Sequence, residues 1–169
     1  FSVDPDKGFI LNGRPLPLRG VCRHQDRLYK GNALTKEEHW EDARIIKELG
    51  ANTIRLAHYQ HSQDFYDACD ELGFVVWAEI PFISVFDPTP EAHENCKSQL
   101  TELIVQNFNH PSICFWGLSN EILIGGISEQ LVENHKELNH LAHKLDGTRL
   151  TTIAHVSMTP GEPPLHDKA

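Results

Sequence analysis

Two hydrophobic periods alternate along the chain. Short apolar runs, typical of buried strands, are followed by segments whose apolar residues recur at the spacing of an amphipathic helix. This pattern predicts five strands, over residues 16–22, 52–57, 74–80, 112–118 and 150–154. It predicts four helices between them, over residues 35–49, 62–72, 90–107 and 128–145.

Turn and cap residues support these limits. An Asn12–Gly13 pair between two short apolar runs predicts an opening β-hairpin within residues 1–16. Thr35 and Glu38 have the spacing of a capping box at a helix start. Residues 158–169 contain three prolines and no periodicity, so we expect an irregular tail there.

The alternation of strands with helices predicts an α/β fold with parallel neighbouring strands and helical crossovers. Two architectures fit. A complete five-stranded doubly wound sandwich suits 169 residues, whereas a whole (β/α)8 barrel needs about 250. The alternative is a partial (β/α)8 TIM barrel of about five strands. In both cases we expect residues 1–169 to form a single domain.

Composition places the chain among globular proteins and disfavours two classes of partner. Hydrophobic residues make up 40% and charged residues 23% of the chain, which supports a sizeable core. A formal net charge of −9 disfavours nucleic acid and anionic membrane as partners. We find no signal peptide, and no apolar run approaches the roughly 18 residues of a membrane span, so the localisation stays open.

Ionisable and amide side chains gather at one end of the predicted strands. In both architectures the site lies beyond the carboxyl ends of the strands. The residues found at those ends are His24 and Asp26, Arg55 and His58, Glu79, and Asn120 and Glu121. Any one of them could be a solvated loop residue, but their density at one rim favours a functional site.

Two kinds of site are disfavoured by missing motifs. The turn after the first strand has no glycine, so it does not resemble a phosphate-binding loop. No His-x-His or His-Glu-x-x-His pattern indicates a metal site, and none of the four cysteines forms a CxxC pair. We therefore expect no cofactor, no metal ion, and free, buried thiols at Cys22, Cys69, Cys96 and Cys114.

The most informative segment follows the fourth strand. An apolar run over 113–118 delivers an amide, Asn120, and a carboxyl group, Glu121, side by side. Glycoside hydrolysis needs a carboxylic acid that protonates the leaving oxygen, and an amide beside it can bind a sugar hydroxyl. An isolated Asn-Glu pair can equally be a helix cap, so the pair alone does not decide.

Five stretches of the chain resemble the catalytic TIM barrel of glycoside hydrolase family 2, the β-galactosidase and β-glucuronidase group. They are residues 9–15, 18–26, 50–59, 75–81 and 109–121. The last, which runs from Asn-His-Pro-Ser to Trp-Gly-Leu-Ser-Asn-Glu, is the most specific. The resemblance covers about residues 8–157 and favours the partial TIM barrel, its amino-terminal portion, over the sandwich.

The resemblance implies roles at the fourth strand. Glu121 would be the general acid/base of a retaining mechanism, and Asn120 would contact the 2-hydroxyl of the sugar. Trp116, earlier on the same strand, would support them from behind.

It also implies roles at the first three strands. His24, Arg55 and His58 would line the sugar subsite, with Asp26 nearby. Arg55 could instead orient the nucleophile through a salt bridge, an equally good alternative. Glu79 would lie behind these residues and support them.

Two departures from the family pattern matter. Some β-galactosidases of the family bind magnesium through a Glu and a His just after the third strand, but residues 82–85 are Phe-Ile-Ser-Val, so we expect no magnesium there. A retaining enzyme also needs a second carboxylate as nucleophile, which the family supplies from a seventh strand. We expect this nucleophile to lie outside the chain, and the isolated chain to be inactive.

The expected substrate is a terminal β-glycoside. A β-galactoside is favoured and a β-glucuronide comes next, because the net charge of −9 leans slightly against an anionic sugar. A non-enzymatic alternative is a half-barrel that binds sugar weakly or self-associates through its open edge, since exposed strand edges need covering.

Overall fold

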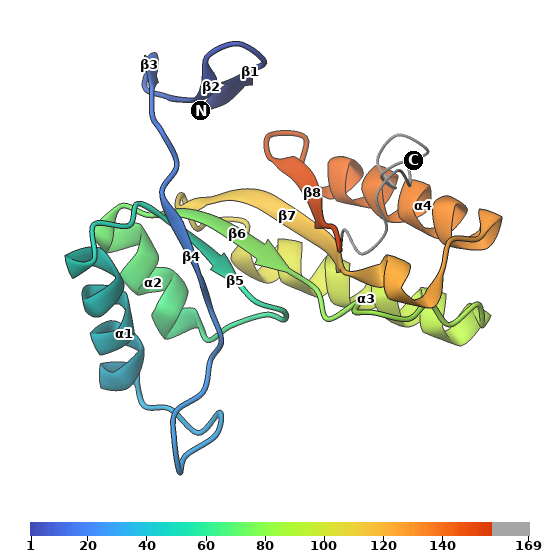
Figure 1. Ribbon diagram of the computed structural model, residues 1–169, viewed down its shortest axis with the longest axis horizontal. Coiled ribbons are helices and arrows are strands. Elements are labelled where there is room, and N and C mark those ends of the chain that lie inside the picture. Colours follow the sequence, from blue (N-terminus) through green and yellow to red (C-terminus); the bar gives the residue numbers. More distant parts are fainter. Residues whose placement is uncertain (157–169) are drawn as a thin grey trace. The chain divides into compact units, whose positions relative to one another are not determined.

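The computed structural model describes residues 1–156 and contains two sheets (Figure 1). A small antiparallel sheet has the order β1-β2-β3, made of Ser2–Asp4, Gly8–Leu11 and Arg14–Pro15. A parallel five-stranded sheet has the order β4-β5-β6-β7-β8, made of Gly20–Arg23, Thr53–Leu56, Val75–Glu79, Ile113–Asn120 and Leu150–Ala154. The predicted tail, residues 158–169, lies outside the described residues.

The helices are α1 (Lys36–Glu48), α2 (Gln63–Leu72), α3 (Pro90–Asn107) and α4 (Glu129–Leu145), and a 3-10 turn, η1, spans Ile122–Gly125. The turn η1 and strand β1 were not predicted, whereas each of the four α-helices begins and ends within a residue of its predicted limits. Each of these starts at a hydroxyl cap, namely Thr35, Ser62, Thr89 and Ser128. The capping box of Thr35 and Glu38 is present as predicted.

The order of the parallel strands decides between the two predicted architectures. A doubly wound sandwich reverses its strand order at a switch point, whereas a barrel adds each strand beside the previous one. Strands β4 to β8 follow one another in sequence order without a reversal. The five strands with their helices are therefore a partial TIM barrel, and the sandwich is excluded.

Two strand limits differ from the prediction by more than one residue. Strand β4 begins at Gly20 rather than residue 16, because the Leu16 N–H donates to the Phe9 carbonyl of the small sheet at 2.8 Å and Pro17 cannot donate to a sheet ladder. Strand β7 continues through Ser119 to Asn120, beyond the apolar run, because the Asn120 N–H still donates to the Phe82 carbonyl at 2.9 Å.

The described chain divides into two compact units. The first comprises Phe1–Arg55, His61–Trp77 and His110–Cys114. In it α1 packs against α2 (Figure 1). Helix α2 buries Phe65, Tyr66, Ala68 and Cys69 and ends at Gly73, whose φ is 70°. This is the left-handed conformation, which a glycine adopts without strain.

The second unit comprises Leu56–Gln60, Ala78–Asn109 and the chain from Phe115 onward. In it α3 packs against α4, and α4 lies against β8 (Figure 1). Strand β7 is buried along almost its whole length, which is typical of a parallel strand covered on both faces. Its carboxyl end and the segments around it carry the predicted acid.

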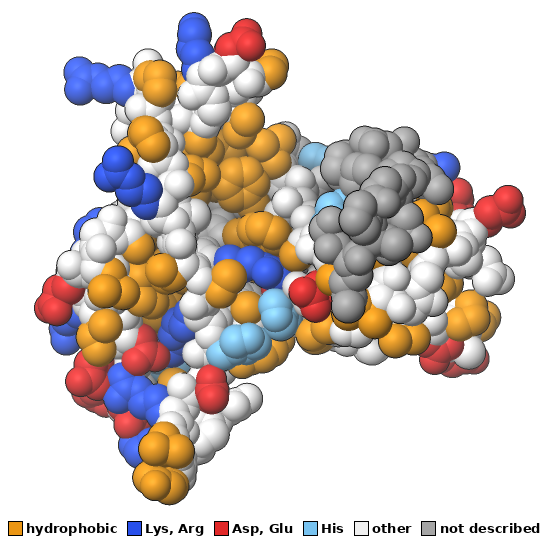
Figure 2. Space-filling view, in the orientation of Figure 1, with side chains coloured by type: hydrophobic (Ala, Val, Ile, Leu, Met, Phe, Trp, Pro, Cys, Tyr) orange, Lys and Arg blue, Asp and Glu red, His pale blue; other side chains and the backbone are white. Residues whose placement is uncertain are grey.

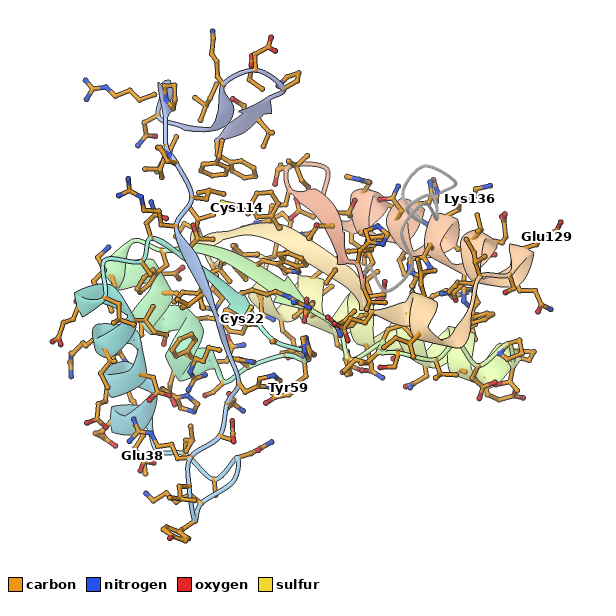
Figure 3. The ribbon with its side chains drawn as sticks, viewed as in Figure 1. Cys22, Glu38, Tyr59, Cys114, Glu129 and Lys136 are labelled. Carbon is orange, nitrogen blue, oxygen red and sulfur yellow. The ribbon has the colours of Figure 1, made fainter. Side chains whose placement is uncertain are left out.

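The four cysteines are free thiols, as predicted. Cys69 and Cys114 are buried, whereas Cys96 is half-buried and Cys22 on β4 is exposed, contrary to the expectation of burial; Cys22 and Cys114 are labelled in Figure 3. Among the described residues, no helix is both long and apolar enough to cross a membrane.

In the second unit a buried carboxylate, Asp146, connects strand β7 to the segment just before β8. Asp146 accepts hydrogen bonds from the Trp116 indole at 3.0 Å and from the Arg149 guanidinium at 2.7 Å. Its other oxygen accepts from the backbone and hydroxyl of Thr148. Burial raises the pKa of Asp146, but these four donors outweigh it and hold the pKa below its ordinary value.

We expect Asp146→Asn to destabilise this unit by about 2–3 kcal/mol, because charge-assisted hydrogen bonds are lost and an amide nitrogen then faces donors. The lowered pKa means that the stabilisation is complete above the ordinary aspartate value and disappears as the pH falls below it. Amide hydrogen exchange of β7 and β8 measures the loss. Asp87→Asn, at an exposed aspartate of the same unit, should change it little. Unchanged exchange in Asp146→Asn would contradict the prediction.

Candidate functional site

The two units divide the predicted site residues between them. The second unit holds five: His58, Glu79, Trp116, Asn120 and Glu121. The first unit holds three: His24, Asp26 and Arg55. In both units the residues other than Trp116 occupy the carboxyl ends of sheet strands or the segments that follow them, as the rim argument predicted.

Backbone hydrogen bonds clamp the end of β7 from both sides. The Asn120 N–H donates to Phe82 at 2.9 Å, and the Asn120 carbonyl accepts from Ser84 at 3.0 Å. On the other side, the Glu121 N–H donates to the Ala154 carbonyl of β8 at 2.8 Å. The side chains of Asn120 and Glu121 therefore extend from a backbone that is hydrogen-bonded to the neighbouring segments on both sides.

Glu121 has a left-handed backbone, with φ 51° and ψ 26°, immediately before η1. This conformation is unfavourable for a residue other than glycine, and such strain persists where the surrounding structure imposes it, often at functional sites. The turn is supported by a hydrogen bond from Ile124 N–H to the Glu121 carbonyl at 3.0 Å. The Glu121 side chain is half-buried, so it combines a fixed origin with access to solvent.

His58 and Glu79 form a second tie in the same unit. His58 follows β5 after a cis peptide bond with Ala57, and its Nδ1 lies 2.6 Å from Oε1 of Glu79. Glu79 is fully buried, whereas the His58 side chain is 24% exposed. A carboxylate can only accept, so Nδ1 carries the proton and the imidazole is oriented by the buried acid. This geometry fits a sugar-binding histidine supported by Glu79.

A hollow of about 260 Å³ lies beside Glu79. It is lined by Tyr59, Gln60, Glu79, Ile80, Pro81, Gln99, Glu102 and Leu103. Tyr59 is labelled in Figure 3. The lining does not include Asn120 or Glu121, so this hollow adjoins the supporting carboxylate rather than the predicted acid.

Trp116 is fully buried on β7, with its indole N–H on Asp146 and its ring 5.4 Å from the Arg149 guanidinium. Its polar contacts thus run to the segment between α4 and β8. Its support of the acid stays a prediction.

The loop after β4 carries His24 and Asp26, both exposed. Between them, the Gln25 side chain accepts from the backbone N–H of Ser62 at 2.6 Å, at the start of α2. Just before them, Arg23 is buried, although no role was predicted for it.

Arg23 anchors this loop through the first unit. Its Nε and Nη2 donate to Asp42 at 3.1 and 2.6 Å, and its guanidinium lies 3.9 Å from the Phe65 ring centroid. Its terminal nitrogens also lie 3.1 Å from Nδ1 of His39 and of His61. Because an arginine can only donate, both imidazoles accept through an unprotonated Nδ1.

The same carboxylate also holds the next turn. Arg27 donates to Asp42 at 2.6 Å and to the exposed Glu41 at 2.7 Å. Arg27 and Gly31 close a tight turn whose tip exposes Leu28 and Tyr29. Figure 2 shows hydrophobic side chains at the end of the loop between β4 and α1. Asp42 therefore fixes the loop that carries His24 and Asp26.

Arg55, at the end of β5, is half-buried, and its guanidinium lies 4.7 Å from the Trp77 ring centroid. The flat cation over an aromatic ring is a cation–π contact, which limits the directions that the guanidinium can take. Its two predicted roles, sugar contact and nucleophile orientation, stay open.

One group of potential metal ligands occurs among the described residues, and it includes none of the predicted site residues. Asp67, Asp70 and His110 lie together in the first unit. Asp70 accepts from His110 at 2.6 Å and from the Ser112 N–H at 3.0 Å. Each of its two oxygens is thus hydrogen-bonded to a residue just before β7. The expectation that the site binds no metal stays a prediction.

Two comparisons identify similar proteins. The TIM barrel domain of the glycosyl hydrolases family 2 matches residues 3–162. A β-glucuronidase of Bacteroides fragilis is 52% identical over 91% of this chain and 23% of its own length. A β-galactosidase of Thermoanaerobacterium thermosulfurigenes is 40% identical over 87% of this chain and 20% of its own length.

Solved structures agree with the curated relatives. An FMN-binding β-glucuronidase from Facaelibacterium prausnitzii L2-6 is 70% identical, with a TM-score of 0.95, over 98% of this chain and 26% of its own. The chain therefore spans about a fifth to a quarter of the length of these relatives.

Proposed function

The chain belongs to the TIM barrel part of glycosyl hydrolase family 2, and from this membership we propose that the complete protein containing it hydrolyses terminal β-glycosides with retention of configuration. The observation that carries the proposal is the end of β7. A buried strand, hydrogen-bonded on both sides, presents Asn120 and a strained, half-buried Glu121 next to each other.

Glu121 is the general acid/base in this proposal. In the first step its carboxylic acid protonates the glycosidic oxygen while a second carboxylate attacks the anomeric carbon and the aglycone leaves. In the second step the Glu121 carboxylate takes a proton from water, which attacks the same carbon and releases the sugar. Protons balance over the cycle, because Glu121 loses one in the first step and regains one in the second.

The second carboxylate comes from another part of the complete protein in this proposal. It must lie about 5–5.5 Å from the Glu121 carboxyl group. The family resemblance assigns it to a seventh strand, and the matched relatives are about four to five times longer than the part that this chain covers. The nucleophile is thus expected outside the 169 residues.

The remaining site residues bind and orient the sugar. Asn120 donates to or accepts from the hydroxyl next to the anomeric carbon, and His58, oriented by buried Glu79, binds a second hydroxyl. In this proposal His24, Asp26 and Arg55 also bind the sugar.

We propose a β-glucuronide as the substrate, with a β-galactoside as the alternative. The support is the ranking of the relatives: the two with 52% and 70% identity are named β-glucuronidases, whereas the β-galactosidase is 40% identical. This reverses the preference that net charge suggested, because a charge summed over the whole chain does not describe the potential at one site.

Turnover of two matched substrates tests the proposal. We expect the complete protein to hydrolyse 4-nitrophenyl β-D-glucuronide with a kcat/KM at least tenfold above that for 4-nitrophenyl β-D-galactoside. These aglycones are identical, so the ratio reports the sugar alone. A preference for the galactoside would overturn the substrate, and turnover of neither would overturn the substrate class. Inversion of the released sugar, followed by NMR, would overturn the mechanism.

A further inference from the structure

A buried serine–histidine pair connects helix α4 to the end of β7. Nε2 of His135 lies 2.8 Å from the hydroxyl oxygen of Ser119. Ser119 is 1% exposed and His135 2% exposed, so water does not compete for the contact. His135 lies on α4 next to Lys136, which is labelled in Figure 3.

The proton positions of this pair follow from its partners. Nδ1 of His135 lies 3.0 Å from the Leu131 carbonyl, which can only accept, so Nδ1 carries a proton. Burial lowers the pKa of His135, and nearby His155 lowers it further, against the effect of the Leu131 carbonyl. His135 is therefore neutral at neutral pH, and Nε2 accepts the Ser119 hydroxyl proton.

The same imidazole reaches the other side of the clamp around Asn120. Its ring stacks on Phe82 with a centroid separation of 5.5 Å and an interplanar angle of 29°. Phe82 is the residue whose carbonyl accepts the Asn120 N–H, and Ser119 precedes Asn120 directly. One side chain thus contacts two of the residues that hold Asn120: Ser119, which precedes it in the chain, and Phe82, which accepts its N–H.

A purely apolar pair could fill this space without a polar group that must be satisfied, since burying a hydroxyl and an imidazole is costly unless each is hydrogen-bonded. The polar pair differs from an apolar one in that its hydrogen bond is directional. It fixes the orientation of the Ser119 side chain relative to α4, and Ser119 lies two residues before Glu121, so the end of β7 is held as well.

We propose that His135 is a positioning residue that acts through Ser119 and Phe82 to hold the end of β7, and with it the Glu121 carboxyl group, in the geometry for proton transfer. This inference rests on the proposed function of Glu121. Misplacing a catalytic group by about 1 Å can cost up to 100-fold in rate, so the support should appear in kcat more than in KM.

Three variants of the complete protein separate positioning from mere stability. His135→Phe keeps an aromatic ring against Phe82 but removes the hydrogen bond, and Ser119→Ala removes it from the other side. The double variant removes both polar groups, so no buried group is left without a partner. We expect each to lower kcat about tenfold on 4-nitrophenyl β-D-glucuronide with KM changed less than twofold, and the double variant to stay as slow as the single ones.

Two further variants complete the test. His135→Gln places an amide oxygen that can accept the Ser119 hydroxyl proton, as Nε2 of His135 does, and it should keep most of the wild-type kcat. His140→Gln, at an exposed histidine of the same helix, should be indistinguishable from the wild type. A double variant that regains the wild-type kcat would overturn the inference, because the single variants would then suffer only from an unpaired polar group.

Amide hydrogen exchange gives a readout that does not depend on turnover. We expect His135→Phe and Ser119→Ala to raise exchange over residues 118–125 about tenfold, with α3 unchanged. If the wild type hydrolyses no glycoside, the proposed function fails while this measurement still decides the local role of His135. Unchanged exchange over 118–125 would overturn the inference in either case.

Discussion

Glu121→Gln should lower the kcat/KM of the complete protein for an alkyl β-glucuronide by about 10²- to 10⁴-fold, the usual contribution of general acid–base catalysis. An alkoxide is a poor leaving group, so its departure needs the proton that glutamine cannot supply. For a 4-nitrophenyl glycoside the first step depends less on protonation. We therefore expect a burst of 4-nitrophenol followed by slow turnover, because glutamine also cannot activate water in the second step. Stopped-flow absorbance measures both phases.

The matched control is Glu133→Gln, an exposed glutamate of α4 in the same unit, which should keep the wild-type rates for both substrates. Added azide distinguishes the role of Glu121 from a structural one. A small anionic nucleophile needs no general base, so it should speed up the second step in Glu121→Gln and give a β-glycosyl azide. Equal losses of rate for alkyl and aryl substrates, without rescue by azide, would argue against the acid/base role.

The helices could be predicted because their limits are set by neighbouring residues. The hydroxyl cap of Thr89 followed by Pro90 starts α3, and Gly73 ends α2, through interactions within one turn. The order of the strands is a property of the whole chain, so the pattern of apolar residues could not separate a barrel from a sandwich. Strand β1 was not predicted because its limits are set by the antiparallel pairing of Ser2–Asp4 with Gly8–Ile10, not by a pattern within its own three residues.

The candidate site was predicted only as far as its residues follow strands directly. Asn120 and Glu121 end a long apolar run, and this made them conspicuous. The supports of the site join residues far apart in sequence, such as Ser119 with His135, 16 residues on, or Arg23 with His61, 38 residues on. Propensity and periodicity carry no information about such pairs.

A usable signal for these supports was nevertheless present. His135 occupies the same helix face as Leu131 and Leu138, and His39 that of Ala43 and Ile46, at spacings of three or four residues. A histidine on the apolar face of an amphipathic helix must find a polar partner inside, because an unpaired buried imidazole is costly. Both histidines have such a partner, and each partner belongs to a strand end near the predicted site.

Asp42→Asn should destabilise the first unit by about 3 kcal/mol, near the lower end of what breaking a buried ion pair costs. The lower end applies because the Asp42 side chain is 21% exposed, while that of Arg23 is 5% exposed. The amide cannot accept from Arg23 and Arg27 together as the carboxylate does, and a buried guanidinium loses its countercharge. Amide hydrogen exchange of α1 and β4 measures the loss, which corresponds to roughly 100-fold faster exchange through local opening. The activity should fall too, because the loop with His24 and Asp26 loses its anchor.

Glu41→Gln is the matched control, since Glu41 also pairs with Arg27 but is exposed, and a surface pair contributes at most about 1 kcal/mol.

The pH dependence of stability gives an independent check on Asp42. Burial, followed by the charge of Arg23, lowers the pKa of His39, so stability should fall as the pH drops below the ordinary histidine value and His39 is protonated on unfolding. Burial raises the pKa of Asp42, but the hydrogen bonds from Arg23 and Arg27 outweigh it and lower it, so a second loss should follow below the ordinary aspartate value. Asp42→Asn should reduce the second loss, part of which remains because the pKa values of Glu37 and Glu38 are lowered too. A variant that loses as much stability below the ordinary aspartate value as the wild type would show that Asp42 does not hold this unit together.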